Sequence, residues 1–112
     1  MKYLVLIYSN PDTRKIWESM SEQERGVGWQ AYAALDEELR AAGELVVSEA
    51  LEDPSQGRRP VPSDGPFAEV KEHLAGFLLL DCRDMDRAME IAAKIPEAPY
   101  GVVEVRPVKQ LG

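Results

Sequence analysis

The run Phe77-Leu78-Leu79-Leu80 is apolar at every position, and the run Tyr3-Leu4-Val5-Leu6-Ile7-Tyr8 near the start of the chain shares this character. A strand with one face in water alternates between apolar and polar residues, whereas a strand covered on both faces does not. We therefore predict that residues 3–8 and 76–82 form two strands at the centre of a sheet.

A long amphipathic helix is expected between these two strands. Ser21 and Glu24 have the spacing of a capping box, in which each side chain satisfies the other residue's free backbone N–H at a helix start. Gly43 ends the helix. Its apolar residues recur every three or four positions, at Tyr32, Leu35, Leu39 and Ala42. The preceding residues 11–20 begin with turn-forming residues and are predicted to be an irregular or one-turn connection.

A second helix is expected after the strand at 76–82. Asp84 is a suitable N-cap, and Pro96 stops the helix because proline cannot donate the backbone hydrogen bond. The apolar positions again recur every three or four residues, at Met85, Ala88, Met89, Ala92 and Ile95.

Two further segments are predicted to be edge strands, because charged or polar residues interrupt their apolar pattern. The first covers residues 45–51. The second covers residues 102–108, where Val103 and Val105 face one side and Glu104 and Arg106 the other. Residues 52–63 contain three prolines and no apolar periodicity, and are predicted to be an exposed loop.

The predicted order is β-α-β, loop, β-α-β, which is typical of a ferredoxin-like α+β sandwich in a single domain spanning residues 1–112. Such a fold has a four-stranded antiparallel sheet with both helices on one face. Right-handed crossovers place the first and third strands in the middle. Two helices cover only one face of the sheet, so the second apolar face of the central strands needs another cover. We predict a homodimer packed sheet to sheet.

Composition limits the classes of partner. The chain has 112 residues, of which 45% are hydrophobic, and a net charge of −7. A negative surface repels nucleic acid and anionic lipid, so we expect neither as a partner. No apolar run approaches the roughly 20 residues of a membrane-spanning helix. Cys82 is the single cysteine, which excludes an intramolecular disulfide, and no secretory signal is apparent, so a cytoplasmic location is expected.

Three stretches resemble a known family: residues 2–8, the string Asp64-Gly65-Pro66-Phe67-Ala68-Glu69-Val70-Lys71-Glu72 followed by Gly76-Phe77, and residues 100–107. Together they resemble the DGPF branch of the YCII-related family. The resemblance implies a dimeric α+β barrel of ferredoxin-like protomers, found mostly in bacteria. It also implies no established activity, and frequent genomic pairing with extracytoplasmic-function sigma factors.

The chain departs from the family pattern in two places. Members of the branch usually carry a longer, hairpin-like insert before the motif, where this chain has the short segment 57–62. Related YCII proteins have a histidine early in the first helix, proposed to act with an aspartate, whereas this chain has Gly28-Trp29-Gln30 in that region. A His-Asp catalytic dyad is therefore not transferred to this chain.

The candidate ligand-binding residues fall into two groups. The motif supplies Asp64, Phe67, Glu69, Lys71 and Glu72, and the sheet supplies Tyr8, Glu49, Glu104 and Arg106. One interpretation is a pocket in which a carboxylate and an ammonium hold a small polar ligand or shift each other's pKa. The other is a structural ion pair that fixes the loop. Glu104 and Arg106 line a cavity between sheets if their face is the dimer face, with Glu49 as a neighbour, and are solvated edge charges otherwise.

Other reactive residues point to no recognisable site. His73 is the single histidine, too few for a metal set, and is expected to be exposed. Cys82 is expected in the core. The segment Gly26-Val27-Gly28 lacks the strand and third glycine of a dinucleotide-binding loop. Trp29, Tyr32 and the Met85 and Met89 pair are interpreted as packing against the sheet. We expect no cofactor.

Three functions remain open from the sequence. The first is a homodimeric small-ligand-binding domain with a polar pocket near the motif. The second is a small-metabolite enzyme that uses a glutamate or aspartate base with Lys71 as electrostatic partner. The third is an interaction module linked to sigma-factor regulation, which rests only on the family's genomic company.

Overall fold

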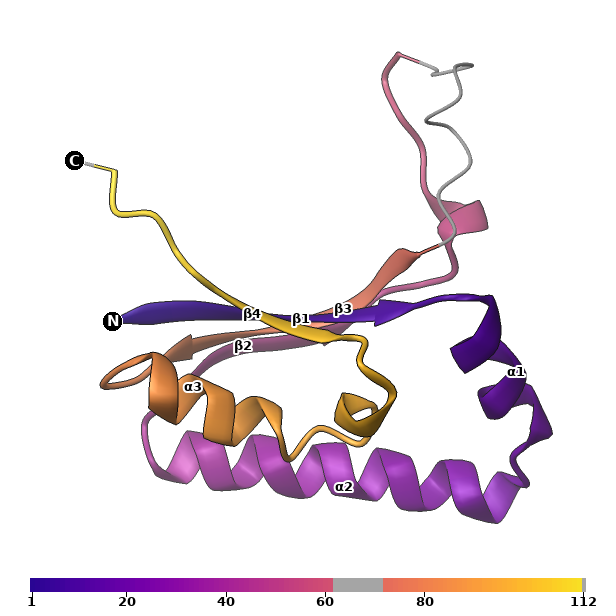
Figure 1. The fold of residues 1–112 in the computed structure, drawn as a ribbon, viewed down its shortest axis with the longest axis horizontal. Coiled ribbons are helices and arrows are strands. Elements are labelled where there is room, and N and C mark those ends of the chain that lie inside the picture. The colour runs from indigo at the N-terminus through magenta and orange to yellow at the C-terminus, as the bar shows by residue number, and fades with distance from the viewer. Residues whose placement is uncertain (62–71, 112) are drawn as a thin grey trace.

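The computed structural model describes residues 1–61 and 72–111. Their elements, in chain order, are β1 (Lys2–Ser9), α1 (Pro11–Ser19), α2 (Glu22–Ala41), β2 (Leu45–Ala50), the 3₁₀ turn η1 (Pro54–Gln56), β3 (His73–Asp81), α3 (Met85–Ala92), the 3₁₀ turn η2 (Ala98–Tyr100) and β4 (Val103–Pro107), as Figure 1 shows.

The four strands form one antiparallel sheet in the order β2-β3-β1-β4. The two strands that are apolar throughout, β1 and β3, occupy the centre, and the two interrupted strands lie at the edges. The predicted ferredoxin-like α+β architecture is therefore confirmed. The register between β1 and β3 shifts between Ile7 and Tyr8, where β3 carries one extra residue, Ala75.

Helices α2 and α3 lie on the same side of the sheet (Figure 1). Alternate residues of the central strands face them, so Val5 and Leu78 are directly paired and buried. From α2, Leu35 and Leu39 complete this core, and from α3 the buried residues are Ala88, Ile91 and Ala92. The predicted stripe of α2 is confirmed at its centre, whereas Ala42 is exposed.

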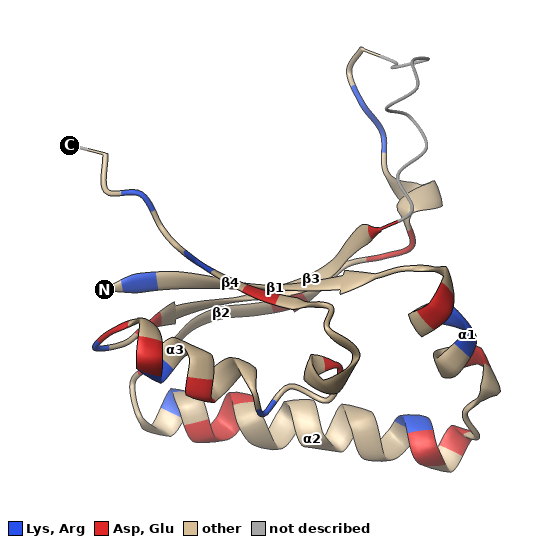
Figure 2. Ribbon diagram, viewed as in Figure 1, with Lys and Arg blue, Asp and Glu red and all other residues tan. Residues whose placement is uncertain are grey.

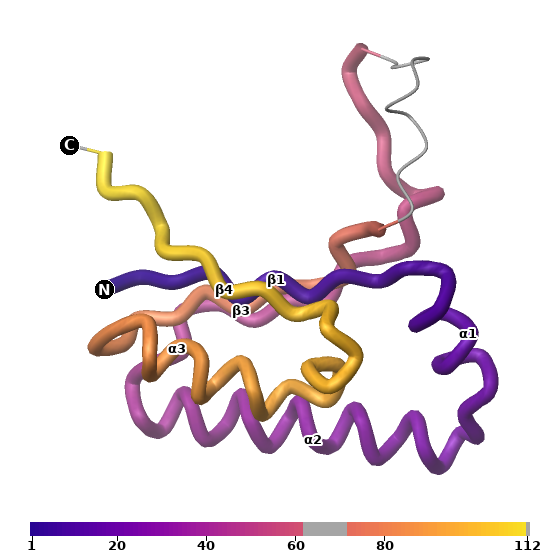
Figure 3. Tube along the Cα trace, viewed as in Figure 1, coloured from indigo at the N-terminus to yellow at the C-terminus, as the bar shows by residue number. Residues whose placement is uncertain are grey.

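The opposite side of the sheet carries none of the described helices (Figures 1 and 3). We call this surface the open face. Register places two rows of residues across it from edge to edge. One row is Glu104, Leu6, Phe77 and Glu49, and the other is Arg106, Leu4, Leu79 and Val47. Residues 51–61 and 108–111 extend away from the sheet on this side (Figure 3).

Helix α1 replaces the irregular connection expected at residues 11–20, and that prediction was wrong. Asn10 caps the helix with a capping box, accepting from the Thr13 backbone N–H at 2.9 Å, and Pro11 occupies the first turn. Asparagine and proline favour both a turn and a helix start. Helix α1 is short and polar and buries none of its side chains, so no buried apolar stripe distinguishes it from a turn. Its Arg14 pairs with Asp53 at 3.2 Å instead.

Helix α3 also differs from the expectation in detail. Its N-cap is Asp84, as predicted, but the helix ends at Ala92, and the chain continues through turns to Pro96. Met89 is 54% exposed whereas Ile91 is fully buried. Cys82 lies in the core, as predicted, and burial raises the pKa of its thiol.

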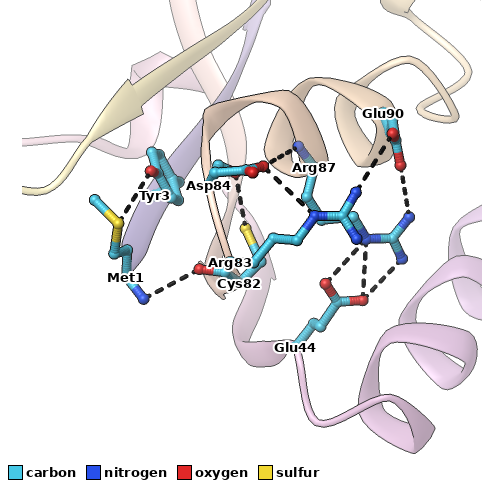
Figure 4. Close-up of polar contacts among 8 residues, drawn as sticks. All are labelled: Met1, Tyr3, Glu44, Cys82, Arg83, Asp84, Arg87 and Glu90. Atoms are coloured by element: carbon cyan, nitrogen blue, oxygen red, sulfur yellow. Dashed lines mark hydrogen bonds and ion pairs between the residues drawn. The ribbon is translucent and has the colours of Figure 1, made fainter.

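A cluster of opposite charges joins the start of β2 to α3 (Figure 4), where both signs of charge lie together in Figure 2. Arg87 donates to Glu44 through Nε and Nη2, at 3.0 and 2.8 Å, and to Glu90 through Nη1 at 3.1 Å. Both Arg87 and Glu44 are at least four-fifths buried. The hydrogen bonds from Arg87 hold the pKa of Glu44 below its usual value. The pairing is complementary, so we interpret it as structural.

Candidate functional site

The predicted site residues divide by location. Asp64, Phe67, Glu69 and Lys71 lie outside the described residues. Glu72 directly precedes β3 and is exposed. The four predicted sheet residues, Tyr8, Glu49, Glu104 and Arg106, belong to the open face by their register.

Tyr8 is the centre of the first candidate site. Its hydroxyl donates to Glu104 Oε1 at 3.0 Å. This hydrogen bond, together with burial and the negative charges of Glu104 and Glu72, raises the pKa of Tyr8, while the positive charge of Arg106 opposes the shift. The structure therefore brings four predicted residues into one electrostatic group. A hollow of about 330 Å³ beside them is lined by Tyr8, Glu72, Gly101, Val102, Val103 and Glu104.

Glu49 does not join this group within one protomer. It shares the open face, but β3 and β1 separate its strand from β4. Neighbouring strands are about 4.8 Å apart, so roughly 14 Å divides Glu49 from Glu104. The prediction that Glu49 neighbours Glu104 and Arg106 concerns a cavity between the sheets of two protomers, and it stays a prediction.

A second hollow, of about 630 Å³, lies under the loop that follows β2, and its lining includes Asp53, Arg59, Glu72 and His73. Hydrogen bonds from Ser55 hold the pKa of Asp53 below its usual value, and Arg14 and His73 add to the shift. His73 is half-buried as the first residue of β3 rather than exposed. Within residues 1–61 and 72–111, no group of histidine, cysteine and carboxylate side chains is placed to hold a metal ion.

The structure also reveals a polar cluster that the sequence did not indicate. Tyr32, on the sheet-facing side of α2, donates its hydroxyl hydrogen to Glu97 Oε2 at the start of η2. Burial raises the pKa of both residues. One turn along α2, the carboxylate oxygen Oδ1 of Asp36 is buried and has no hydrogen-bond partner in the described part of the chain. Tyr32 and Glu97 are 65 positions apart, so no local sequence pattern could reveal their hydrogen bond.

Comparison with known protein families identifies the family of this chain. The chain matches the YCII-related domain over residues 1–112. The chain belongs to the YCII-related family. An uncharacterised protein of Rhizobium meliloti is 35% identical to it over 118 residues, which cover 96% of this chain and 92% of the relative. The more specific assignment to the DGPF branch stays a prediction.

One similar solved structure is 5-chloro-2-hydroxyhydroquinone dehydrochlorinase (TftG) from Burkholderia phenoliruptrix, in complex with 2,5-dihydroxybenzoquinone. It covers 98% of this chain and 95% of its own length with a TM-score of 0.57, at 18% identity. At that identity the similarity supports the fold. In the described part of this YCII-related chain, no helix has the length and apolar character needed to cross a membrane. The expected cytoplasmic location and the absence of nucleic-acid binding stay predictions.

Proposed function

We propose that this protein is a homodimeric small-molecule-binding domain, with its site at the β4 edge of the open face. The observation that carries the proposal is the hydrogen bond between Tyr8 and Glu104 beside a hollow of about 330 Å³. Small-ligand sites usually have volumes of about 300–1,000 Å³ and a few convergent polar groups. Asp64, Phe67, Glu69 and Lys71 belong to the proposal because they directly precede Glu72 in the sequence.

The chemistry of the group suits a small polar ligand. Glu72 and Glu104 accept hydrogen bonds, Arg106 donates them, and the Tyr8 hydroxyl does both. A molecule with hydroxyl and carbonyl oxygens on a small ring fits this combination. The dihydroxyquinone bound by the similar dehydrochlorinase carries both kinds of oxygen, which makes it a reasonable first probe.

The dimer is proposed from the composition of the open face. Each row of side chains across the sheet is polar at the β4 edge and apolar in the middle, as in the row Glu104, Leu6 and Phe77. An apolar centre with a polar rim is typical of a protein interface. A second copy of the chain offers a matching surface, since a two-fold axis pairs a patch with itself.

Sedimentation at micromolar concentration tests the dimer. We expect the wild-type protein to sediment as a dimer and Leu79→Lys, at the middle of the open face, as a folded monomer. Val27→Lys is the matched control, because Val27 is 62% exposed on α2. A monomeric wild-type protein would contradict the proposal and would favour a different protein as the cover of this face, as the regulatory hypothesis requires.

Calorimetric titration with 2,5-dihydroxybenzoquinone tests the ligand site. We expect saturable binding that Arg106→Gln weakens about tenfold, since a hydrogen bond to a charged group contributes ~1.5–3 kcal/mol. Arg83→Gln is the control, because Arg83 is exposed beside the N-cap of α3. Equal affinities for both variants and the wild type would remove Arg106 and the Tyr8 group from the site.

A further inference from the structure

The Tyr32 and Glu97 pair lies on the other side of the sheet from the proposed ligand site and is not explained by it. Tyr32 comes from α2 and Glu97 from the turn before β4. Both side chains are partly buried and keep an accessible edge. Among the described residues, no cation contributes to the pKa of Tyr32 or Glu97. Nearby Lys94 is directed to Glu38, at 2.8 Å.

The cluster has unused hydrogen-bond acceptors but no unused donor among the described residues. The single hydroxyl hydrogen of Tyr32 is already donated to Glu97. The Glu97 carboxylate accepts that hydrogen and still has lone pairs available. Asp36 Oδ1 is a further acceptor without a donor in the described residues, and because it is buried it adds to the excess of acceptors rather than to the surface that a ligand can reach. A molecule that binds at this cluster must therefore carry a hydrogen-bond donor.

The aromatic surroundings indicate the shape of such a molecule. Trp29 lies one turn before Tyr32, with ring centroids 6.3 Å apart, and Trp17 packs edge-on against Trp29 at 5.4 Å. Trp29 is 55% exposed, so its ring offers a flat apolar surface beside the polar cluster. Aromatic rings stack favourably on such a surface.

We propose that Tyr32 and Glu97 form an acid–base pair that takes a proton from the hydroxyl group of a small phenol or enol bound beside Trp29. In this step the O–H bond of the ligand breaks and an O–H bond forms on the Glu97 carboxylate. The negative charge moves from Glu97 to the ligand oxygen. The neutral Glu97 carboxyl group is a weaker acceptor than the carboxylate. The Tyr32 hydroxyl can then rotate and donate its hydrogen to the ligand oxyanion.

The electrostatics of the cluster support this direction of transfer. Burial makes Glu97 a stronger base than an exposed glutamate, because it raises the pKa of the carboxyl group. That shift brings Glu97 closer to the pKa of an acidic phenol or enol, and proton transfer is most efficient between matched groups. Glu97 and Asp36 are the charged side chains that act on the pKa of Tyr32, and both raise it.

The probe for this site is 4-nitrophenol, with 4-nitroanisole as a matched compound that lacks the acidic hydrogen. Calorimetric titration across pH should give a bell-shaped affinity for 4-nitrophenol. At low pH Glu97 is protonated and is no longer a charged acceptor, and at high pH the probe is an anion that Asp36 and Glu97 repel. The affinity for 4-nitroanisole should be at least about tenfold weaker, since it cannot donate to a charged acceptor.

Variants assign the acidic and alkaline sides of this affinity–pH profile, its acid and alkaline limbs, to particular groups. Glu97→Gln should remove the acid limb and weaken binding at the optimum about tenfold, while the alkaline limb, which belongs to the probe, stays. Tyr32→Phe should also weaken binding, and Glu37→Gln, on the exposed side of α2, should change nothing. The proposal fails if 4-nitrophenol shows no saturable binding, if 4-nitroanisole binds equally well, or if Glu97→Gln keeps the acid limb. The comparison of the two probes needs no variant, so it stands even if Glu97→Gln does not fold.

Discussion

Two partly or largely buried groups of ionisable side chains in this protein are built in opposite ways. At the start of β2, Glu44 and Glu90 surround Arg87, and each charge faces its opposite. In the middle of α2, Tyr32 and Glu97 share a hydrogen and have Asp36 as a neighbour, with no cation contributing to the pKa of either. Complementary charges hold a structure together, whereas unbalanced acids in a partly buried place are typical of a functional site.

The two groups should respond to pH in opposite directions. The pKa of Glu44 is lowered in the folded protein, so its stabilising contribution is present above its unfolded pKa of about 4.5 and is lost as the pH falls through the lowered value. The pKa of Glu97 is raised, so its contribution is present below about 4.5 and is lost as the pH rises through the raised value. Melting curves of single variants against pH can therefore separate them.

The largest effect is expected from Glu44→Ala. Removal of this carboxylate leaves Arg87 without its main partner, and we expect a loss of about 1–2 kcal/mol in the free energy of unfolding at neutral pH. The loss should shrink on acidification. Lys94→Ala is the control, because it breaks a pair with Glu38 in which both side chains are about half exposed. Denaturant unfolding measures both, and equal losses would show that burial does not distinguish the Glu44 pair.

A smaller effect with the reverse pH dependence is expected from Glu97→Gln. The amide cannot ionise, so the variant avoids the cost of a buried carboxylate, and its stability relative to the wild type should rise as the pH increases above about 4.5. Its magnitude should stay below about 1 kcal/mol at neutral pH, because the side chain is only partly buried. A relative stability that is constant across pH would mean that Glu97 behaves as an ordinary surface glutamate.

The smallest effect is spectroscopic. Burial and the hydrogen bond to Glu97 raise the pKa of Tyr32 strongly, so this phenol should ionise late in an alkaline titration followed by ultraviolet absorbance. Tyr32→Phe should remove that late step while the remaining absorbance change is preserved. Tyr100→Phe, which alters an exposed tyrosine, should keep it. A late step that persists in Tyr32→Phe would assign it to a different residue.

The sequence predicted the sheet well because its information is local. Apolar residues at every position of β1 and β3 indicate burial on two sides, and the order of elements then limits the topology to few choices. The same alternation predicts that Glu104 and Arg106 share one face of their strand but leaves open which face, and the register places them with Tyr8 on the open face. Helix α1 is short and polar and buries none of its side chains, so its first residues are typical of a turn as much as of a helix start.

The two charged clusters could not be predicted, for a physical reason. Glu44 and Arg87 are 43 positions apart, and Tyr32 and Glu97 are 65 apart. Each contact depends on how α2 and α3 pack against the sheet, and a shift of one helical turn would break it. The spacing of Tyr32 in α2 predicts packing, which is true of its ring but does not reveal the hydrogen bond of its hydroxyl group.

The pairing of β1 with β3 and β4 has a consequence for folding during synthesis. The register joins Ser9 to His73 and Tyr3 to Pro107, so the central strand is made long before either of its neighbours. The apolar residues of β1 therefore have no strand partner while α1, α2 and β2 emerge from the ribosome. Long-range strand pairing of this kind is slow and exposes aggregation-prone surface. A ribosome-bound chain halted before residue 73 is therefore expected to hold a helical α2 and an uncovered β1 strand, which is the form that a chaperone would bind.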